Sequence, residues 1–131
     1  MKYELKILPN TKIAIYCWSG EMTLKDREDS RHHVMQFCQE NSINQVILDT
    51  RQEINKTRTM QMFDFAAAIP ERMRGLRIAV IRQADDEEIK FGENVAINRG
   101  ANLRTFLTLE DAQRWIESET ATPDKPVQSD S

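Results

Sequence analysis

Short apolar runs separated by helix-like segments are the feature that most limits how this sequence can fold. Five runs are predicted to be strands, and they lie at 3–8, 13–18, 46–49, 76–81 and 102–108. The first alternates apolar and charged residues, which is typical of a half-buried strand. It is joined to the second by Pro9-Asn10-Thr11, a connection short enough for an antiparallel hairpin.

Four helices are predicted between and after the later strands. Thr23 is expected to cap the first, with Asp26 completing a capping box. Its buried stripe is expected to consist of Leu24, Arg31, Val34, Met35, Phe37 and Cys38. The densely charged stretch 25–31 is expected to face water.

The other three helices are also bounded by recognisable signals. The second is expected to run from a capping Thr59 to Ile69, where Pro70 stops it. Four acidic residues at 85–88 favour the start of the third, and Gly100 suits its end. The fourth covers 109–117.

The order β-β-α-β-α-β-α-β-α predicts one α/β domain, because strands that alternate with helices form a largely parallel sheet with right-handed crossovers. The opening hairpin adds one antiparallel strand, which gives a five-stranded mixed, mainly parallel sheet. The domain is expected to span residues 1–118. Residues 119–131 contain two prolines and no apolar periodicity, so they are predicted to be a disordered tail.

Composition excludes several classes of function. No apolar run approaches the ~20 residues needed to cross a bilayer, the first residues do not resemble a signal peptide, and two cysteines make no disulfide framework. We therefore expect a cytoplasmic protein with reduced thiols. A net charge of −3 argues against nucleic-acid binding. No Cys/His cluster has metal-ligand spacing, so neither a metal nor a cofactor is predicted.

The segment after the third strand is the strongest candidate for a binding site. It contains Arg51, Lys56 and Arg58, and two threonines, Thr57 and Thr59, at the predicted start of the second helix. Ligands of open α/β sheets bind outside the carboxyl ends of the strands, and a helix N-terminus favours anions. This segment is either a site for an anionic ligand or an acidic partner, or a solvated loop with a threonine cap. Residues 41–83 carry a net charge of +3 and residues 84–100 carry −3, so the basic side should meet an anionic partner.

The second helix is apolar nearly all round, with Met62, Phe63 and Phe65 among its large residues. A surface helix of a two-layer domain should show a polar face. Either the helix packs closely on the sheet, or one side is left for a partner subunit or an apolar ligand.

Several motifs resemble STAS domains, which share the SpoIIAA-like fold. Trp18-Ser19-Gly20-Glu21 is similar to the turn that opens the first helix of that family, and Val46-Ile47-Leu48-Asp49 to its third strand. Residues 98–106 and 109–116 resemble the branch grouped with SEC14/CRAL-TRIO lipid-binding proteins. Members that are anti-sigma factor antagonists carry an Asp-Ser-Ser-Gly-like phosphorylation motif. Here the equivalent stretch is 55–60, which has no serine, and Thr57 and Thr59 are the hydroxyls in register.

The resemblance implies a non-enzymatic regulatory or protein-interaction module that contacts a partner, or a second copy of itself, through the second helix and the loop before it. The alternative is a carrier of a small lipid-like or anionic ligand, with an apolar cavity near Phe63, Phe65 and Phe91 and with Arg58 at its mouth. An enzyme is not expected, because the sequence contains no nucleophile–base pair, metal set or glycine-rich phosphate loop.

Overall fold

The computed structural model describes residues 2–118. The predicted tail at 119–131 lies outside the described residues. The described chain forms ten elements, which are β1 (Lys2–Ile7), β2 (Ile13–Met22), α1 (Leu24–Glu40), β3 (Gln45–Asn55), α2 (Thr59–Ala67), α3 (Ile69–Arg72), β4 (Arg77–Ile81), α4 (Glu87–Asn98), β5 (Leu103–Phe106) and α5 (Leu109–Ser118).

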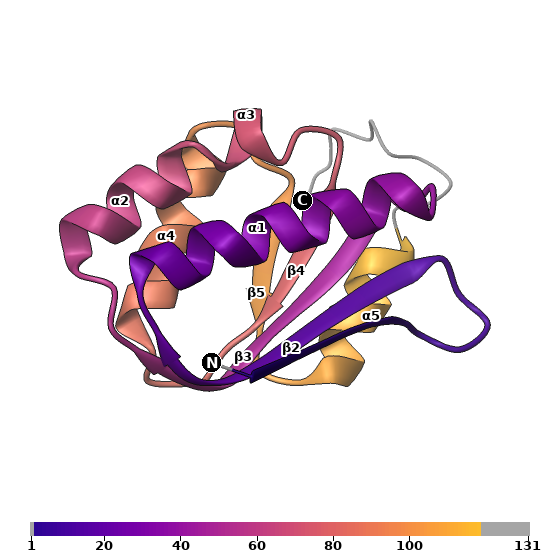
Figure 1. The fold of residues 1–131 in the computed structure, drawn as a ribbon, viewed down its shortest axis with the longest axis horizontal. Helices are drawn as coiled ribbons and strands as arrows, with labels where there is room; N and C mark the ends of the chain where they lie inside the picture. Colours follow the sequence, from indigo (N-terminus) through magenta and orange to yellow (C-terminus); the bar gives the residue numbers. More distant parts are fainter. Residues whose placement is uncertain (1, 119–131) are drawn as a thin grey trace.

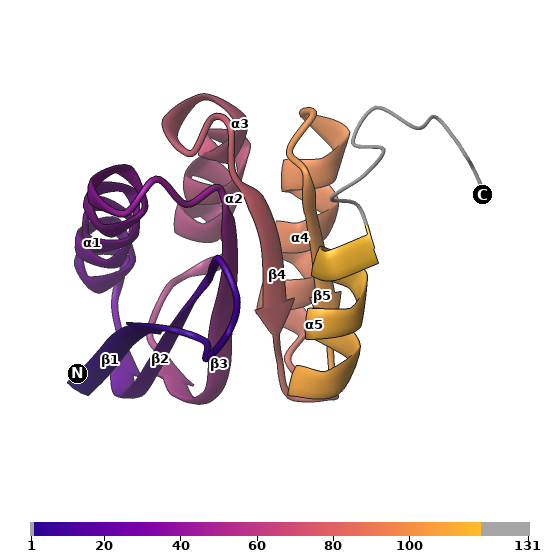
Figure 2. The ribbon, with the colours of Figure 1, turned by 90° about the vertical axis from the view of Figure 1, so that its right-hand side faces the viewer.

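The five strands form one sheet in the order β1-β2-β3-β4-β5 (Figure 1). β1 and β2 are antiparallel and the other neighbours are parallel, as the sequence predicts. Because each parallel strand is added on the same side of the last, right-handed crossovers place α1, α2 and α4 on one face. α5 follows the last strand and packs on the opposite face, as Figures 1 and 2 show.

Each face of the sheet has its own apolar core. The larger core lies under α1, α2 and α4 and includes Tyr16, Val46 and Ile78. The smaller lies under α5 and includes Ile15, Ile47 and Ala79, joined by Ala112 and Ile116 from the helix. Successive residues of a central strand point alternately into the two cores, so these strands are buried on both sides. This accounts for their continuous apolar sequences.

The helix after β3 is shorter than predicted. α2 ends at Ala67 and Pro70 does not stop it. Instead, Pro70 occupies the first turn of a separate four-residue helix, α3. A proline in the first helical turn loses no hydrogen bond, because the N–H groups there have no partner within the helix. The described chain therefore contains five helices, rather than four.

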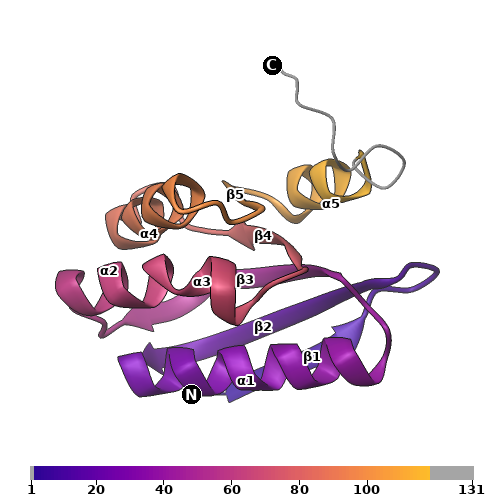
Figure 3. The same cartoon turned by 90° about the horizontal axis from the view of Figure 1, so that it is seen from above.

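α2 lies in the middle of the helical layer, between α1 and α4 (Figure 3). Contact with the sheet and with helices on both sides explains its apolar sequence. α2 approaches α4 closely at Gly92, where an added Cβ atom would lie 3.1 Å from the sulfur of Met62. Most of the apolar surface of α2 is thus used within the domain.

Two strands continue beyond their predicted ends. The sequence predicts that the second strand ends at residue 18 and the third at residue 49. In the structure β2 extends to Met22 and β3 extends to Asn55. Gly20 permits this because it adopts a φ angle of +97°, which favours glycine. β4 pairs with β3 only as far as Asp49, so the last residues of β2 and β3 form a two-stranded extension of the sheet.

A β-bulge reverses the side-chain pattern at the start of this extension. Cys17 pairs with Asp49, but Ser19 pairs with Gln52, so β3 contains one extra residue in this interval. Since side chains alternate between faces, one extra residue exchanges the faces of all that follow. Glu53 consequently points under α1 and is buried, whereas Ile54 is 56% exposed.

No helix in residues 2–118 is long and apolar enough to span a membrane.

Candidate functional site

A buried ion pair lies where α1 crosses the two-stranded extension. The guanidinium of Arg27 donates from Nη2 to Oε2 of Glu53 at 2.7 Å and from Nη1 to Oε1 at 3.3 Å. Arg27 is 5% exposed and Glu53 is 7% exposed. The charges are therefore matched in a bidentate geometry, which is the arrangement that best offsets the cost of burying two ions.

Four further hydrogen bonds connect this pair to its surroundings. Trp18 Nε1 donates to Glu53 Oε1 at 2.8 Å, and Arg27 donates to Asn55 Oδ1 at 2.9 Å and to Thr57 Oγ1 at 2.8 Å. The Thr57 hydroxyl in turn donates to the carbonyl of Met22 at 3.2 Å. The network joins α1, β2, β3 and the segment before α2, so it fixes the direction in which the chain leaves the sheet.

Sequence reasoning missed both members of this pair. Arg27 was expected to face water because it lies in a run of charged residues. Its spacing from Arg31, Val34 and Cys38 nevertheless places it on the buried face of the helix. This helical spacing could have predicted the burial of Arg27. Glu53 had no such signal, because its face depends on the bulge.

The two candidate phosphorylation sites have different surroundings. Thr57 is 5% exposed, and its hydroxyl both accepts from Arg27 and donates to Met22. Thr59 is exposed at the first position of α2, and its hydroxyl donates to Glu88 Oε2 at 3.0 Å. The N-cap of this helix is Arg58, rather than the threonine that the sequence suggested.

The three cations of the predicted binding segment are not brought together. Arg51 lies within β3 and donates to both oxygens of Asp49, at 3.0 Å and 2.8 Å. Burial opposes ionisation of Asp49, but the hydrogen bonds from Arg51 outweigh it and lower the pKa of this carboxyl group. Lys56 and Arg58 are exposed, and neither forms an ion pair with another residue in 2–118.

The apolar candidates on α2 point mainly into the domain. Met62 is 3% exposed and belongs to the larger core. The ring of Phe63 lies 6.4 Å from that of Phe91, and the guanidinium carbon of Arg99 lies 5.6 Å from its centre. Met60 is the large residue of this helix that faces solvent, with 69% exposure.

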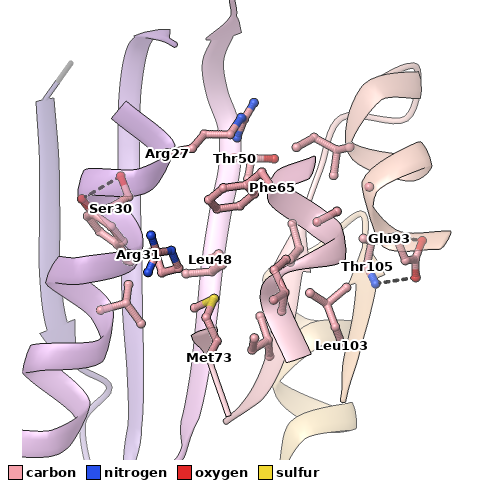
Figure 4. A pocket seen from close by; sticks show the side chains of 18 of the residues that line it. Arg27, Ser30, Arg31, Leu48, Thr50, Phe65, Met73, Glu93, Leu103 and Thr105 are labelled. Carbon is pink, nitrogen blue, oxygen red and sulfur yellow. Dashed lines mark hydrogen bonds between the residues drawn. The ribbon is translucent and has the colours of Figure 1, made fainter. Parts of the chain in front are cut away.

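A cavity of about 80 Å³ lies between the sheet and the helical layer. Phe65 lines it, together with side chains from α1, α3 and the central strands (Figure 4). Phe63, Phe91 and Arg58, which the sequence placed at an apolar cavity, do not line it. Its basic residues are Arg27 and Arg31.

The described residues offer little reactive chemistry. Between residues 2 and 118 there is no group of three or more His, Cys, Asp or Glu side chains suited to a metal ion. Burial raises the pKa of the Cys38 thiol to about 11 and also raises that of Cys17. Both thiols are therefore protonated near neutral pH, and a protonated thiol is a poor nucleophile.

Solved structures reveal what this architecture resembles. An uncharacterised protein of the DUF3478 family from Shewanella loihica PV-4, described as having a SpoIIAA-like fold, superposes with a TM-score of 0.58 at 14% identity, covering 88% of this chain and 92% of that one. The chain has a SpoIIAA-like fold. The anti-sigma factor antagonist SpoIIAA in its unphosphorylated form matches with a TM-score of 0.55 at 13% identity, covering 88% and 98%.

These likenesses confirm the fold class that the sequence predicted. No protein-family model and no curated protein matches the chain.

Replacing Glu53 should destabilise the protein strongly. Glu53→Gln removes the negative charge and leaves the Arg27 guanidinium buried without its counter-ion, which typically costs about 3–5 kcal/mol. Urea denaturation measures the change in the free energy of unfolding.

The matched control is Asp111→Asn, which breaks the exposed ion pair between Asp111 and Arg114. Exposed pairs contribute at most about 1 kcal/mol. Equal effects of the two substitutions would contradict the structural role assigned to Glu53.

Proposed function

We propose that this protein is a non-enzymatic regulatory or interaction module, and that it contacts a protein partner through the segment between β3 and α2. The observation that carries this proposal is a row of exposed residues that lies over a buried polar layer. Ile54, Lys56 and residues 58–60 are exposed, whereas Glu53 and Thr57 are buried beneath them.

We call four of the exposed residues, Ile54, Lys56, Arg58 and Met60, the β3–α2 patch. It combines two apolar side chains with two cations that have no ion-pair partner among residues 2–118. Two hydrogen bonds hold the backbone of this segment against the end of β2. The Thr57 hydroxyl donates to the carbonyl of Met22, and Lys56 N donates to the same carbonyl at 2.8 Å. A preorganised segment loses little conformational freedom on binding, which favours affinity. An acidic protein surface with an apolar centre would complement it.

The residues that the sequence indicated as contact candidates have different roles in this proposal. Lys56 and Arg58 are central to it. Arg51 is neutralised by Asp49, while Met62, Phe63 and Phe65 support the contact by holding α2 in place. The same patch could receive another protein or a second copy of this chain, and the experiment below separates the two.

The similarity of its fold to that of SpoIIAA supports a regulatory role for this protein. SpoIIAA is described as an anti-sigma factor antagonist. For this chain we infer a module that acts by contact with another protein.

A second candidate function is supported by the cavity under α2. Its lining is mainly apolar, and apolar cavities in proteins bind small apolar molecules. Its volume of about 80 Å³ is below the ~300–1,000 Å³ of typical ligand pockets. The carrier function is therefore proposed for a small molecule rather than for a complete lipid.

The interaction proposal is tested by photo-crosslinking within the native cells. A photoreactive amino acid placed at Met60 should yield a protein adduct, and charge reversal by Lys56→Glu with Arg58→Glu should reduce its yield at least tenfold. The control position is Leu107, which is also exposed but precedes α5. An adduct of twice the chain mass indicates self-association. No adduct at Met60, or equal adducts at both positions, would contradict the proposal.

We further propose that any phosphorylation of this segment occurs on Thr59. Thr59 is an exposed residue whose hydroxyl makes one hydrogen bond, to Glu88, whereas Thr57 is buried and its hydroxyl makes two. A phosphate on Thr59 would lie at the N-terminus of α2, which favours negative charge. Phosphopeptide mapping of the protein from its native cells should find phosphate on Thr59 and lose it in Thr59→Val. Phosphate on Thr57, or on neither residue across growth conditions, would overturn this assignment.

A further inference from the structure

Arg31 is the least satisfied charged group at the cavity. It lies on α1, is half-buried, and lines the cavity together with Leu48, Phe65 and Met73. Figure 4 shows its guanidinium extending from α1 toward β3, on the side of the cavity opposite Glu93. Within residues 2–118 it forms neither an ion pair nor a side-chain hydrogen bond.

The other charged groups of the lining already have partners. Arg27 is paired with Glu53. The Glu93 carboxylate accepts hydrogen bonds from the backbone N–H of Thr105 at 2.9 Å and from its hydroxyl at 2.8 Å. Arg31 therefore presents an uncompensated positive charge to a lining that is otherwise largely apolar.

We propose that this cavity binds a short aliphatic carboxylate, with its alkyl chain among Leu48, Phe65 and Met73 and its carboxylate on the guanidinium of Arg31. The inference rests on the second candidate function, the small-ligand carrier. It assigns the head-group contact to Arg31 instead of to Arg58.

Chemistry and size both favour this class of ligand. The guanidinium offers a planar set of N–H donors that matches a carboxylate, and a charge-assisted contact is stronger where little water is present. An engineered cavity of about 150 Å³ accommodates benzene, so about 80 Å³ corresponds to roughly three carbon atoms. Butyrate has that many carbons beyond its carboxyl group, whereas a long-chain fatty acid exceeds the volume.

Titration of the full chain with butyrate, monitored by amide and methyl NMR shifts, tests the proposal. A ligand this small is expected to bind with a Kd of roughly millimolar order. The largest shifts should fall on residues around the cavity, including Leu48 and Met73. Butyramide, the uncharged analogue of the same shape, should bind at least fivefold more weakly, and octanoate should bind more weakly than butyrate.

Two substitutions separate the charge from the cavity. Arg31→Gln should weaken butyrate binding about tenfold and leave butyramide binding unchanged. Leu48→Phe should fill the space and abolish both. Lys25→Gln, on the exposed side of the same helix, is the matched control for loss of one positive charge and should bind butyrate like the unsubstituted protein. Thermal unfolding confirms that each variant folds.

The outcomes distinguish failure of the Arg31 contact from failure of the carrier function. Equal binding of butyrate and butyramide, or unchanged butyrate binding by Arg31→Gln, overturns the role of Arg31 but leaves the cavity as an apolar site. Absence of binding by both compounds overturns the inference together with the carrier function. Neither result bears on the β3–α2 patch, whose exposed residues do not line the cavity.

Discussion

The buried ion pair between Arg27 and Glu53 is the interaction on which the candidate sites of this protein depend. The ends of β2 and β3 leave the five-stranded sheet as a two-stranded extension, and such ribbons are marginally stable alone in water. The ion pair and its hydrogen bonds attach this extension to α1. They also fix Thr57, so the order of the β3–α2 segment follows from a contact made elsewhere in the chain.

One bulge makes this arrangement possible. Without the extra residue between Asp49 and Gln52, Glu53 would face the same side of the sheet as Asp49, away from α1. The exchange of faces also exposes Ile54, which becomes part of the proposed β3–α2 patch. A single irregularity thus places a carboxylate in the interior and an apolar side chain at the surface, and it links the internal network to the proposed contact surface.

The sequence predicted the fold well because its central strands are short, apolar and separated by helices with clear boundary signals. Thr23 caps α1, and Gly100 follows α4 with a φ angle of +98°. Prediction of the site was weaker for physical reasons. The polar residues of the β3 extension are stabilised by Arg27, which lies 26 positions before Glu53 in the sequence. The pattern of residues within β3 does not reveal a partner so distant in the chain. Arg31 belongs both to the buried stripe of α1 and to the charged stretch that the sequence predicted to face water, and its orientation toward a cavity depends on the packing of α2.

The most direct test of this account is amide hydrogen exchange at Lys56 and Thr57 in the double variant Arg27→Met with Glu53→Leu. Replacing a buried ion pair by apolar residues of similar size often leaves global stability nearly unchanged, so the amide of Ile78 in β4 serves as the internal reference. We expect exchange at Lys56 and Thr57 to accelerate at least tenfold while that of Ile78 is unaltered. Undiminished protection of both amides in a folded double variant would contradict the claim that the ion pair holds the segment in place.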